Sequence, residues 1–145
     1  MAKPLSADDQ RQPFAMGPGS LFATLTHCYG AEALWLETIE GRDGSAVFAS
    51  ASQIQSLDEL ASRWSELDAR WDRLLSGLTA ADLAKPVTRV REGKAYTTSL
   101  GDVLIHVCTH QMYHAAQLKN MAKQLGVKDL PFSDYIVYAR EQWKG

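Results

Sequence analysis

The sequence predicts an all-α bundle of three long helices, a short C-terminal helix and a small β-hairpin. Apolar residues recur every three or four positions over residues 20–40, 57–78 and 100–125, as on one face of a helix. Residues 86–98 instead carry strand-forming side chains around a glycine turn. The 145 residues fit one domain, residues 1–145, which begins with an irregular lead-in over residues 1–18.

The first long helix is expected over residues 20–40. Ser20 is a suitable N-cap, and Gly41 is a suitable stop. Apolar residues surround much of this helix, which predicts packing on more than one neighbour. Residues 41–55 are rich in Gly, Ser and Ala and are expected to form a flexible connection.

The second long helix has the most regular pattern in the chain. Ser56 and Glu59 are spaced as a capping box at its start, and Gly77 follows its last apolar turn. The hairpin comes next, with Val87 on one strand and Gly93 in the turn. A hairpin alone is only marginally stable, so we expect it to lie against the bundle.

The third long helix is expected over residues 100–125. Thr98 or Ser99 caps its start, and Gly126 ends it. A last short helix is expected over residues 133–143, with its first residue as the cap.

Composition excludes several function classes. The formal net charge is −2 and there is no basic cluster, so we expect no nucleic-acid binding. No apolar run reaches the roughly 18–20 residues of a membrane span, and the N-terminus lacks a signal-peptide core, which predicts a cytoplasmic protein. Cys28 and Cys108 are the two cysteines and imply no disulfide framework.

Two histidines interrupt the apolar stripe of the third helix. His110 and His114 are four residues apart, so both imidazoles lie on the same buried side. Burying two imidazoles is unfavourable unless each has a partner, and one metal ion can bind both. The alternative is a pair of core histidines that are satisfied by hydrogen bonds, and spacing alone leaves both possibilities open.

A metal site would need a third ligand from a facing helix. His27 is the only histidine outside residues 106–114, and it lies on the first long helix. His106 competes for this role, but three successive positions four residues apart span about 12 Å of helix axis and rarely reach one ion. His106 is therefore predicted to be a pocket residue beside the ligands.

No catalytic residue stands out. Gln111 occupies the position at which an H-E-x-x-H metalloprotease has its glutamate, so the helix-borne general base of that motif is absent. Glu32 is interpreted as a surface residue or a hydrogen-bonding partner between helices. A non-haem iron oxygenase would need a carboxylate ligand, and no spacing identifies one.

Three stretches resemble the DinB/YfiT-like family of metal-binding four-helix-bundle proteins. They are residues 21–41, residues 99–126 with the pattern H-V-x-x-H-x-x-x-H-x-x-Q, and residues 132–141. The resemblance implies a divalent metal ion, Zn or Ni, bound by a triad. By position the triad is His27, His110 and His114, and Gln117 matches a recurrent family position.

The chain also departs from the family pattern. Ala115 and Ala116 replace an Arg-Gly pair, and the long helix that usually precedes residue 5 is expected to be missing. Three long helices leave one groove of a four-helix bundle open, which predicts a homodimer.

Two hypotheses about function follow. The first is a metal-dependent enzyme, a thiol transferase or a hydrolase, that activates a thiol or water and acts on a small molecule such as a low-molecular-weight thiol. The second is a non-catalytic, stress-related or partner-binding helical dimer with a vestigial or structural metal site.

Overall fold

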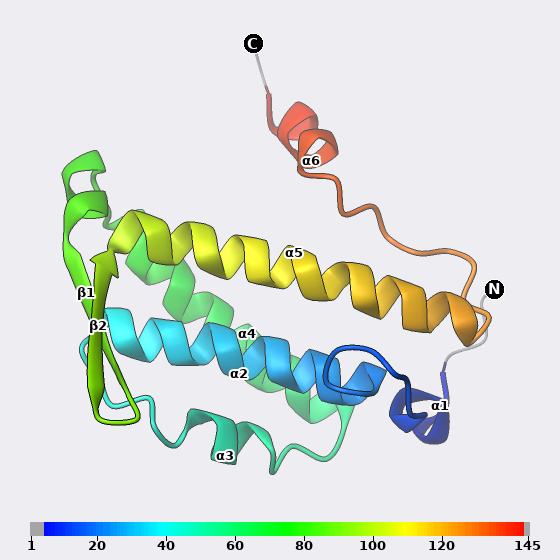
Figure 1. The fold of residues 1–145 in the computed structure, drawn as a ribbon. Helices are drawn as coiled ribbons and strands as arrows, with labels where there is room; N and C mark the ends of the chain where they lie inside the picture. The colour runs from blue at the N-terminus through cyan, green and yellow to red at the C-terminus, as the bar shows by residue number, and fades with distance from the viewer. Residues whose placement is uncertain (1–4, 144–145) are drawn as a thin grey trace.

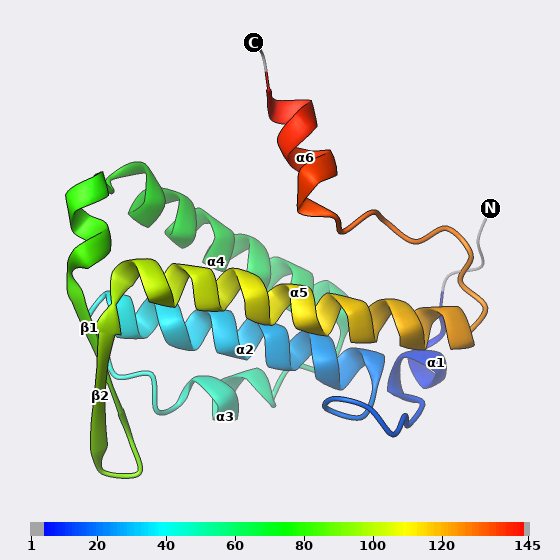
Figure 2. The same ribbon diagram turned by 45° about the horizontal axis from the view of Figure 1, so that its top comes forward.

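The computed structural model describes residues 5–143. The three predicted long helices are confirmed as α2 (Leu21–Ile39), α4 (Leu57–Ser76) and α5 (Leu100–Gln124). They run side by side, and α2 contacts both of the others (Figures 1 and 2). The remaining elements are α1 (Ala7–Arg11), α3 (Val47–Ala51), the 3-10 helix η1 (Ala80–Ala84), β1 (Pro86–Arg91), β2 (Lys94–Ser99) and α6 (Tyr135–Gln142). No fourth long helix occurs within residues 5–143.

Serine side chains begin all three long helices. The hydroxyls of Ser20, Ser56 and Ser99 each accept a hydrogen bond from the backbone N–H three residues later, which satisfies a donor that the helix leaves free. The predicted capping box of α4 is only half formed. The Glu59 carboxylate accepts from the N–H of Gln55 at 2.9 Å, one residue before the cap.

The core is centred on α2. One apolar cluster joins Ala33 and Leu36 of α2 to Leu67 and Trp71 of α4. A second cluster forms where the hairpin meets the start of α5. The packing of α2 on several neighbours is therefore confirmed. Leu104 and Val107 of α5 pack against both clusters, so this burial also holds α5, which carries two of the candidate histidines, beside α2.

Two segments are more ordered than the sequence predicted. Residues 41–55 contain α3, which packs closely on α2. The two helices approach so closely at Gly30 that an added Cβ atom there would lie 3.0 Å from the Phe48 ring. Ala51 and Ile54 are each 2 % exposed, so this connection is anchored and not simply flexible. The lead-in contains α1, capped by Ser6. Both helices are five residues long, too short to give a periodic signal.

The hairpin is confirmed, with Arg89 opposite Tyr96 in its register. Glu92 and Gly93 both have positive φ values, +52° and +74°, as a two-residue turn of the I′ type requires. Val87 is buried against the start of α5, which holds the hairpin at that end of the bundle (Figure 1).

The last helix, α6, begins after Asp134 and not at the predicted cap Ser133. The Ser133 hydroxyl instead accepts a hydrogen bond from Nζ of Lys119 at 2.6 Å. Beyond this anchor α6 projects away from the bundle (Figures 1 and 2). In the part of the chain that the structure describes, no helix combines the length and apolarity that crossing a bilayer requires.

Candidate metal centre

The structure brings three of the four histidines together in the middle of the bundle. His27 comes from α2, and His110 and His114 come from successive turns of α5. The ring centroid of His27 lies 5.2 Å from that of His110 and 4.8 Å from that of His114. One ring nitrogen from each residue falls within 4.8 Å of the other two. In residues 5–143, this is the group of His, Cys, Asp and Glu side chains with the geometry for a metal ion.

The nitrogen separation suits a tetrahedral ion. Nε2 of His27 and Nε2 of His110 lie 3.3 Å apart. Zinc–imidazole bonds of about 2.0–2.1 Å in a tetrahedral arrangement place two ligand nitrogens about 3.3–3.4 Å apart. His27 and His110 therefore have the spacing of two zinc ligands. A ring nitrogen of His114 lies within 4.8 Å of theirs and would complete a three-histidine set, with one coordination position left for a further molecule.

Gln117 orients the most buried of the three rings. Its Oε1 lies 2.8 Å from Nδ1 of His114. An amide oxygen only accepts hydrogen bonds, so Nδ1 of His114 carries the proton and Nε2 keeps its lone pair free. Gly17 also packs against the Gln117 amide, where a Cβ atom would lie 2.4 Å from Oε1. The loop before α2 thus confines the Gln117 amide.

The surroundings favour neutral imidazoles. Burial, with a smaller contribution from the charge of His114, lowers the pKa of His27. Burial lowers the pKa of His110 as well, with the neighbouring histidines adding to the effect. Both rings are therefore neutral at pH 7, which is the form that binds a metal ion.

A carboxylate ties together the helices that carry the histidines. Glu32 of α2 accepts hydrogen bonds from Nε1 of Trp64 in α4 at 2.9 Å and from Nε2 of Gln111 in α5 at 3.1 Å. Nε2 of Gln111 also donates to the backbone carbonyl of Cys28 at 3.0 Å. Burial raises the pKa of Glu32. Because Cys28 follows His27 and Gln111 follows His110, this network fixes the helix separation next to the site.

Two further rings flank the three histidines. His106 is exposed and contacts His110 at 5.8 Å between ring centroids, so it lies beside the group and not within it. Phe48 of α3 stacks on His27 at 5.8 Å. The roles of Phe48 and Gln111 could not be predicted from the sequence, because both depend on contacts between distant segments.

Neither a thiol nor a carboxylate of the described residues joins the group. Cys28 adjoins His27 in sequence, but burial raises the pKa of its thiol to about 11. It therefore stays protonated at neutral pH and packs as a small apolar side chain. An iron site with two histidines and a carboxylate gains no support from these ligands.

Comparison with models of protein families assigns the chain to a superfamily. The sequence model of the DinB superfamily matches residues 1–118. This range contains the three histidines and Gln117 and ends before residues 132–141, so the resemblance of that last stretch stays a prediction. No curated protein matches the chain.

Proposed function

This chain belongs to the DinB superfamily, and we propose that it is a metal-dependent enzyme that activates a thiol or a water molecule. The observation that supports this most directly is the convergence of His27, His110 and His114, with two Nε2 atoms 3.3 Å apart. If these positions served only core packing, aliphatic side chains would suit them better, because aliphatic side chains lack the desolvation penalty of a buried imidazole.

The residues have separate tasks in this proposal. The three histidines hold a divalent ion, Zn or Ni, which would supply positive charge that lowers the pKa of a thiol or water beside it. Gln117 holds the proton on Nδ1 of His114, and Gln111 holds the two helices at a fixed separation. The reaction class is thiol transfer or hydrolysis on a small molecule such as a low-molecular-weight thiol, in the cytoplasm.

The test is a turnover screen with a matched pair of variants. Zn- and Ni-loaded protein is assayed with low-molecular-weight thiols and an electrophilic acceptor, and separately with activated esters, with and without a chelator. We expect chelator-sensitive turnover that His110→Ala removes and His106→Ala reduces far less. Turnover that survives both the chelator and His110→Ala would refute the metal-dependent reaction.

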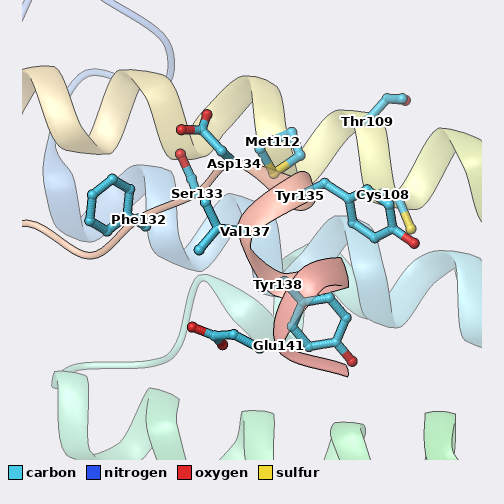
Figure 3. Close-up of a pocket in the computed structure, with 10 residues that line it drawn as sticks. All are labelled: Cys108, Thr109, Met112, Phe132, Ser133, Asp134, Tyr135, Val137, Tyr138 and Glu141. Atoms are coloured by element: carbon cyan, nitrogen blue, oxygen red, sulfur yellow. The ribbon is translucent and has the colours of Figure 1, made fainter. Parts of the chain in front are cut away.

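A second candidate function is partner binding, and one surface favours it. A hollow of about 810 Å³ lies between α5 and α6, and we call it the α5–α6 hollow. Figure 3 shows its lining, which includes Met112 of α5 and Tyr135 and Tyr138 of α6. These three side chains are 46 %, 74 % and 59 % exposed. Contiguous apolar surface of this kind marks association sites.

We propose a second copy of this chain as the occupant. Each copy has exposed apolar side chains on α6 and an apolar hollow beside them. In a two-fold arrangement, the α6 of each copy can therefore cover the α5–α6 hollow of the other copy. Sedimentation at micromolar concentration should give a dimer that Tyr135→Asp dissociates. Leu75→Asp, an exposed apolar position on α4, serves as the control and should leave the dimer intact. A monodisperse monomer of the unaltered chain would contradict this proposal.

A further inference from the structure

The hairpin at one end of the bundle has two unpaired edges (Figure 1). Strands β1 and β2 form a two-stranded sheet, so each has a single neighbour. The N–H of Leu100 donates to the carbonyl of Lys85 at 2.8 Å, which closes the base of the hairpin. Among the described residues, no backbone hydrogen bond joins residues 86–98 to another element. The outward-facing backbone groups are therefore free to pair with another chain.

The register identifies these outward-facing groups on β1. Arg91 and Lys94 flank the two-residue turn and lie opposite each other. The pair that closes such a turn is hydrogen-bonded, and along an antiparallel ladder hydrogen-bonded pairs alternate with pairs that are not. The N–H and C=O groups of Thr88 and Val90 therefore point away from β2, at the free edge of β1.

A cavity of about 280 Å³ runs along this edge. Thr88, Arg89 and Val90 line it on one side, and residues 42–45 and Phe48 line it on the other. Successive side chains of a strand point to opposite faces. A cavity that touches three consecutive residues of β1 and, among the described residues, none of β2 therefore lies at the edge of the strand. Val90 is 67 % exposed, so this edge is accessible.

One face of the hairpin carries most of its positive charge. Residues 85–99 contain four Lys or Arg and one Glu, a formal charge of +3 in a chain whose net charge is −2. They are separated in the sequence, but the register brings Arg89, Arg91 and Lys94 onto one face, because Arg91 lies opposite Lys94. The one glutamate lies 3.4 Å from Arg91. In residues 5–143, Arg89 and Lys94 form no ion pair, and each lies over an aromatic ring.

We propose that the free edge of β1 binds an extended acidic segment of another protein as a third strand. The segment pairs with the outward backbone groups of Thr88 and Val90, and its acidic side chains lie beside Arg89 and Arg91. Because these arginines are two residues apart, the partner carries acidic residues at alternate positions. In this mode of recognition the main chain supplies affinity and alternate side chains supply specificity. The interaction is independent of the candidate metal centre.

Charge decides against a second copy of this chain as the occupant. Two hairpins paired edge to edge would bring two elements of charge +3 together, and like charges on neighbouring strands are destabilising. Asp43 also borders the cavity, but its carboxylate accepts hydrogen bonds from the N–H and the hydroxyl of Ser45 and is engaged within its own loop. The positive charge without ion-pair partners therefore favours an acidic strand.

The simpler explanation is that the basic side chains only protect the free edge. Charged residues on edge strands commonly prevent association with other strands. That role accounts for the charge, but it leaves the cavity beside β1 without a purpose. The two explanations differ in whether an acidic peptide protects the outward amides of β1 from exchange with solvent.

The test follows the backbone amides of the whole chain by NMR during titration with acetyl-ETEVET-amide, which has three carboxylates at alternate positions. The amides of Thr88 and Val90 should exchange about tenfold more slowly at ten times the Kd, because only the free protein exchanges them. The outward amides of β2, those of Ala95 and Thr97, should not change. Added salt should weaken the binding.

Two proline variants form a matched pair. Val90 and Ala95 lie opposite each other, and the N–H of each points outward, so proline at either position leaves the hydrogen bonds between the strands in place. Val90→Pro removes a donor from the edge of β1 and should weaken binding about fivefold. Ala95→Pro should stay within about twofold. Circular dichroism and the protected amides between the strands check that both variants fold.

A second pair of variants tests the charge. Arg91→Gln should weaken binding about two- to fivefold, as expected for loss of an exposed ion pair. Lys85→Gln removes the same formal charge from a side chain that pairs with Asp82 at the base of the hairpin, and it should have a smaller effect.

Several results would overturn the proposal. These are unmoved amide signals at millimolar peptide, equal binding by Val90→Pro, and protection of Ala95 and Thr97 in place of Thr88 and Val90. Binding of the same peptide with every backbone nitrogen methylated would show attraction of anions without strand pairing. Tighter binding of an oligonucleotide of equal charge would assign the basic face to polyanions in general. Protection confined to Thr88 and Val90 supports the third strand whether or not the protein binds metal.

Discussion

Nδ1 of His114 lies 2.8 Å from Oε1 of Gln117, and this contact decides which nitrogen of the ring faces the other histidines. The hydrogen bond holds the proton on Nδ1, so Nε2 is the atom available to a metal ion. Gly17 supports the arrangement from outside the bundle by leaving room for the Gln117 amide. The site therefore depends on residues that bind no metal themselves.

Gln117→Leu should weaken zinc binding about 10–100-fold, the range typical for loss of a group that orients a metal-binding histidine. Leucine removes the acceptor at Nδ1, so the His114 ring can turn or protonate differently. Gln117→Glu keeps an oxygen acceptor and should retain most of the affinity. Competition with a chromophoric chelator measures both variants, and an unchanged affinity in Gln117→Leu would show that the contact does not orient the ring.

Gly17→Ala should also weaken zinc binding, because the added Cβ would lie 2.4 Å from Oε1 of Gln117. Gly19→Ala is the matched control. Both glycines have positive φ values, +53° and +98°, so either substitution should destabilise the fold by about 1–2 kcal/mol. Only Gly17 has Gln117 beside it, since nothing lies within 4 Å of a Cβ at Gly19. Equal zinc affinities in the two variants would argue against confinement of Gln117 by this loop.

Gln111→Leu should lower the free energy of unfolding of the metal-free protein by about 1–3 kcal/mol. It removes the hydrogen bond that Gln111 donates to the Cys28 carbonyl and one of the two hydrogen bonds that reach Glu32 from other helices. Gln124→Leu removes an exposed hydrogen bond within α5 and should change stability by no more than about 0.5 kcal/mol. Urea unfolding compares the two, and equal effects would mean that Gln111 does not join the helices.

The stability of the metal-free protein should fall as pH drops below about 6.5, the ordinary histidine pKa. The folded state holds the pKa of His27 and His110 below that value, chiefly through burial. The unfolded chain therefore binds more protons from about pH 6.5 down to the lowered values, and the free energy of unfolding declines across that window. The raised pKa of Glu32 acts in the opposite direction.

A double variant isolates this contribution. Replacing both His27 and His110 with glutamine removes the two titrating rings and leaves Glu32 in place. Urea unfolding between pH 7.5 and 5.5 should then show a smaller loss of stability than in the unaltered chain. The same loss in both proteins would assign the pH dependence to other groups.

The sequence predicted the parts of this molecule that depend on local pattern. The three long helices followed from their apolar periodicity, and Ser20 and Ser99 followed from helix capping. The spacing of His110 and His114 placed them together, and the scarcity of other histidines pointed to His27. These inferences succeed because helix geometry alone fixes which side chains share a face.

What the sequence could not predict depends on contacts between distant segments. Helix α3 is held by the small residue Gly30, which lets Phe48 approach α2. Gln111 was noticed only for a missing motif, although it bonds to Cys28, 83 residues earlier. Trp35 is half-buried against the apolar cluster at the start of α5, and it lines a cavity together with Arg89 of the hairpin. No local pattern encodes such contacts.

The most direct test is zinc titration of protein prepared without an affinity-metal step. We expect one equivalent to bind to the unaltered chain and to His106→Ala, and none to bind stoichiometrically to His27→Ala, His110→Ala or His114→Ala. Circular dichroism should confirm that each variant stays helical. One tightly bound equivalent retained by folded His110→Ala would contradict the account.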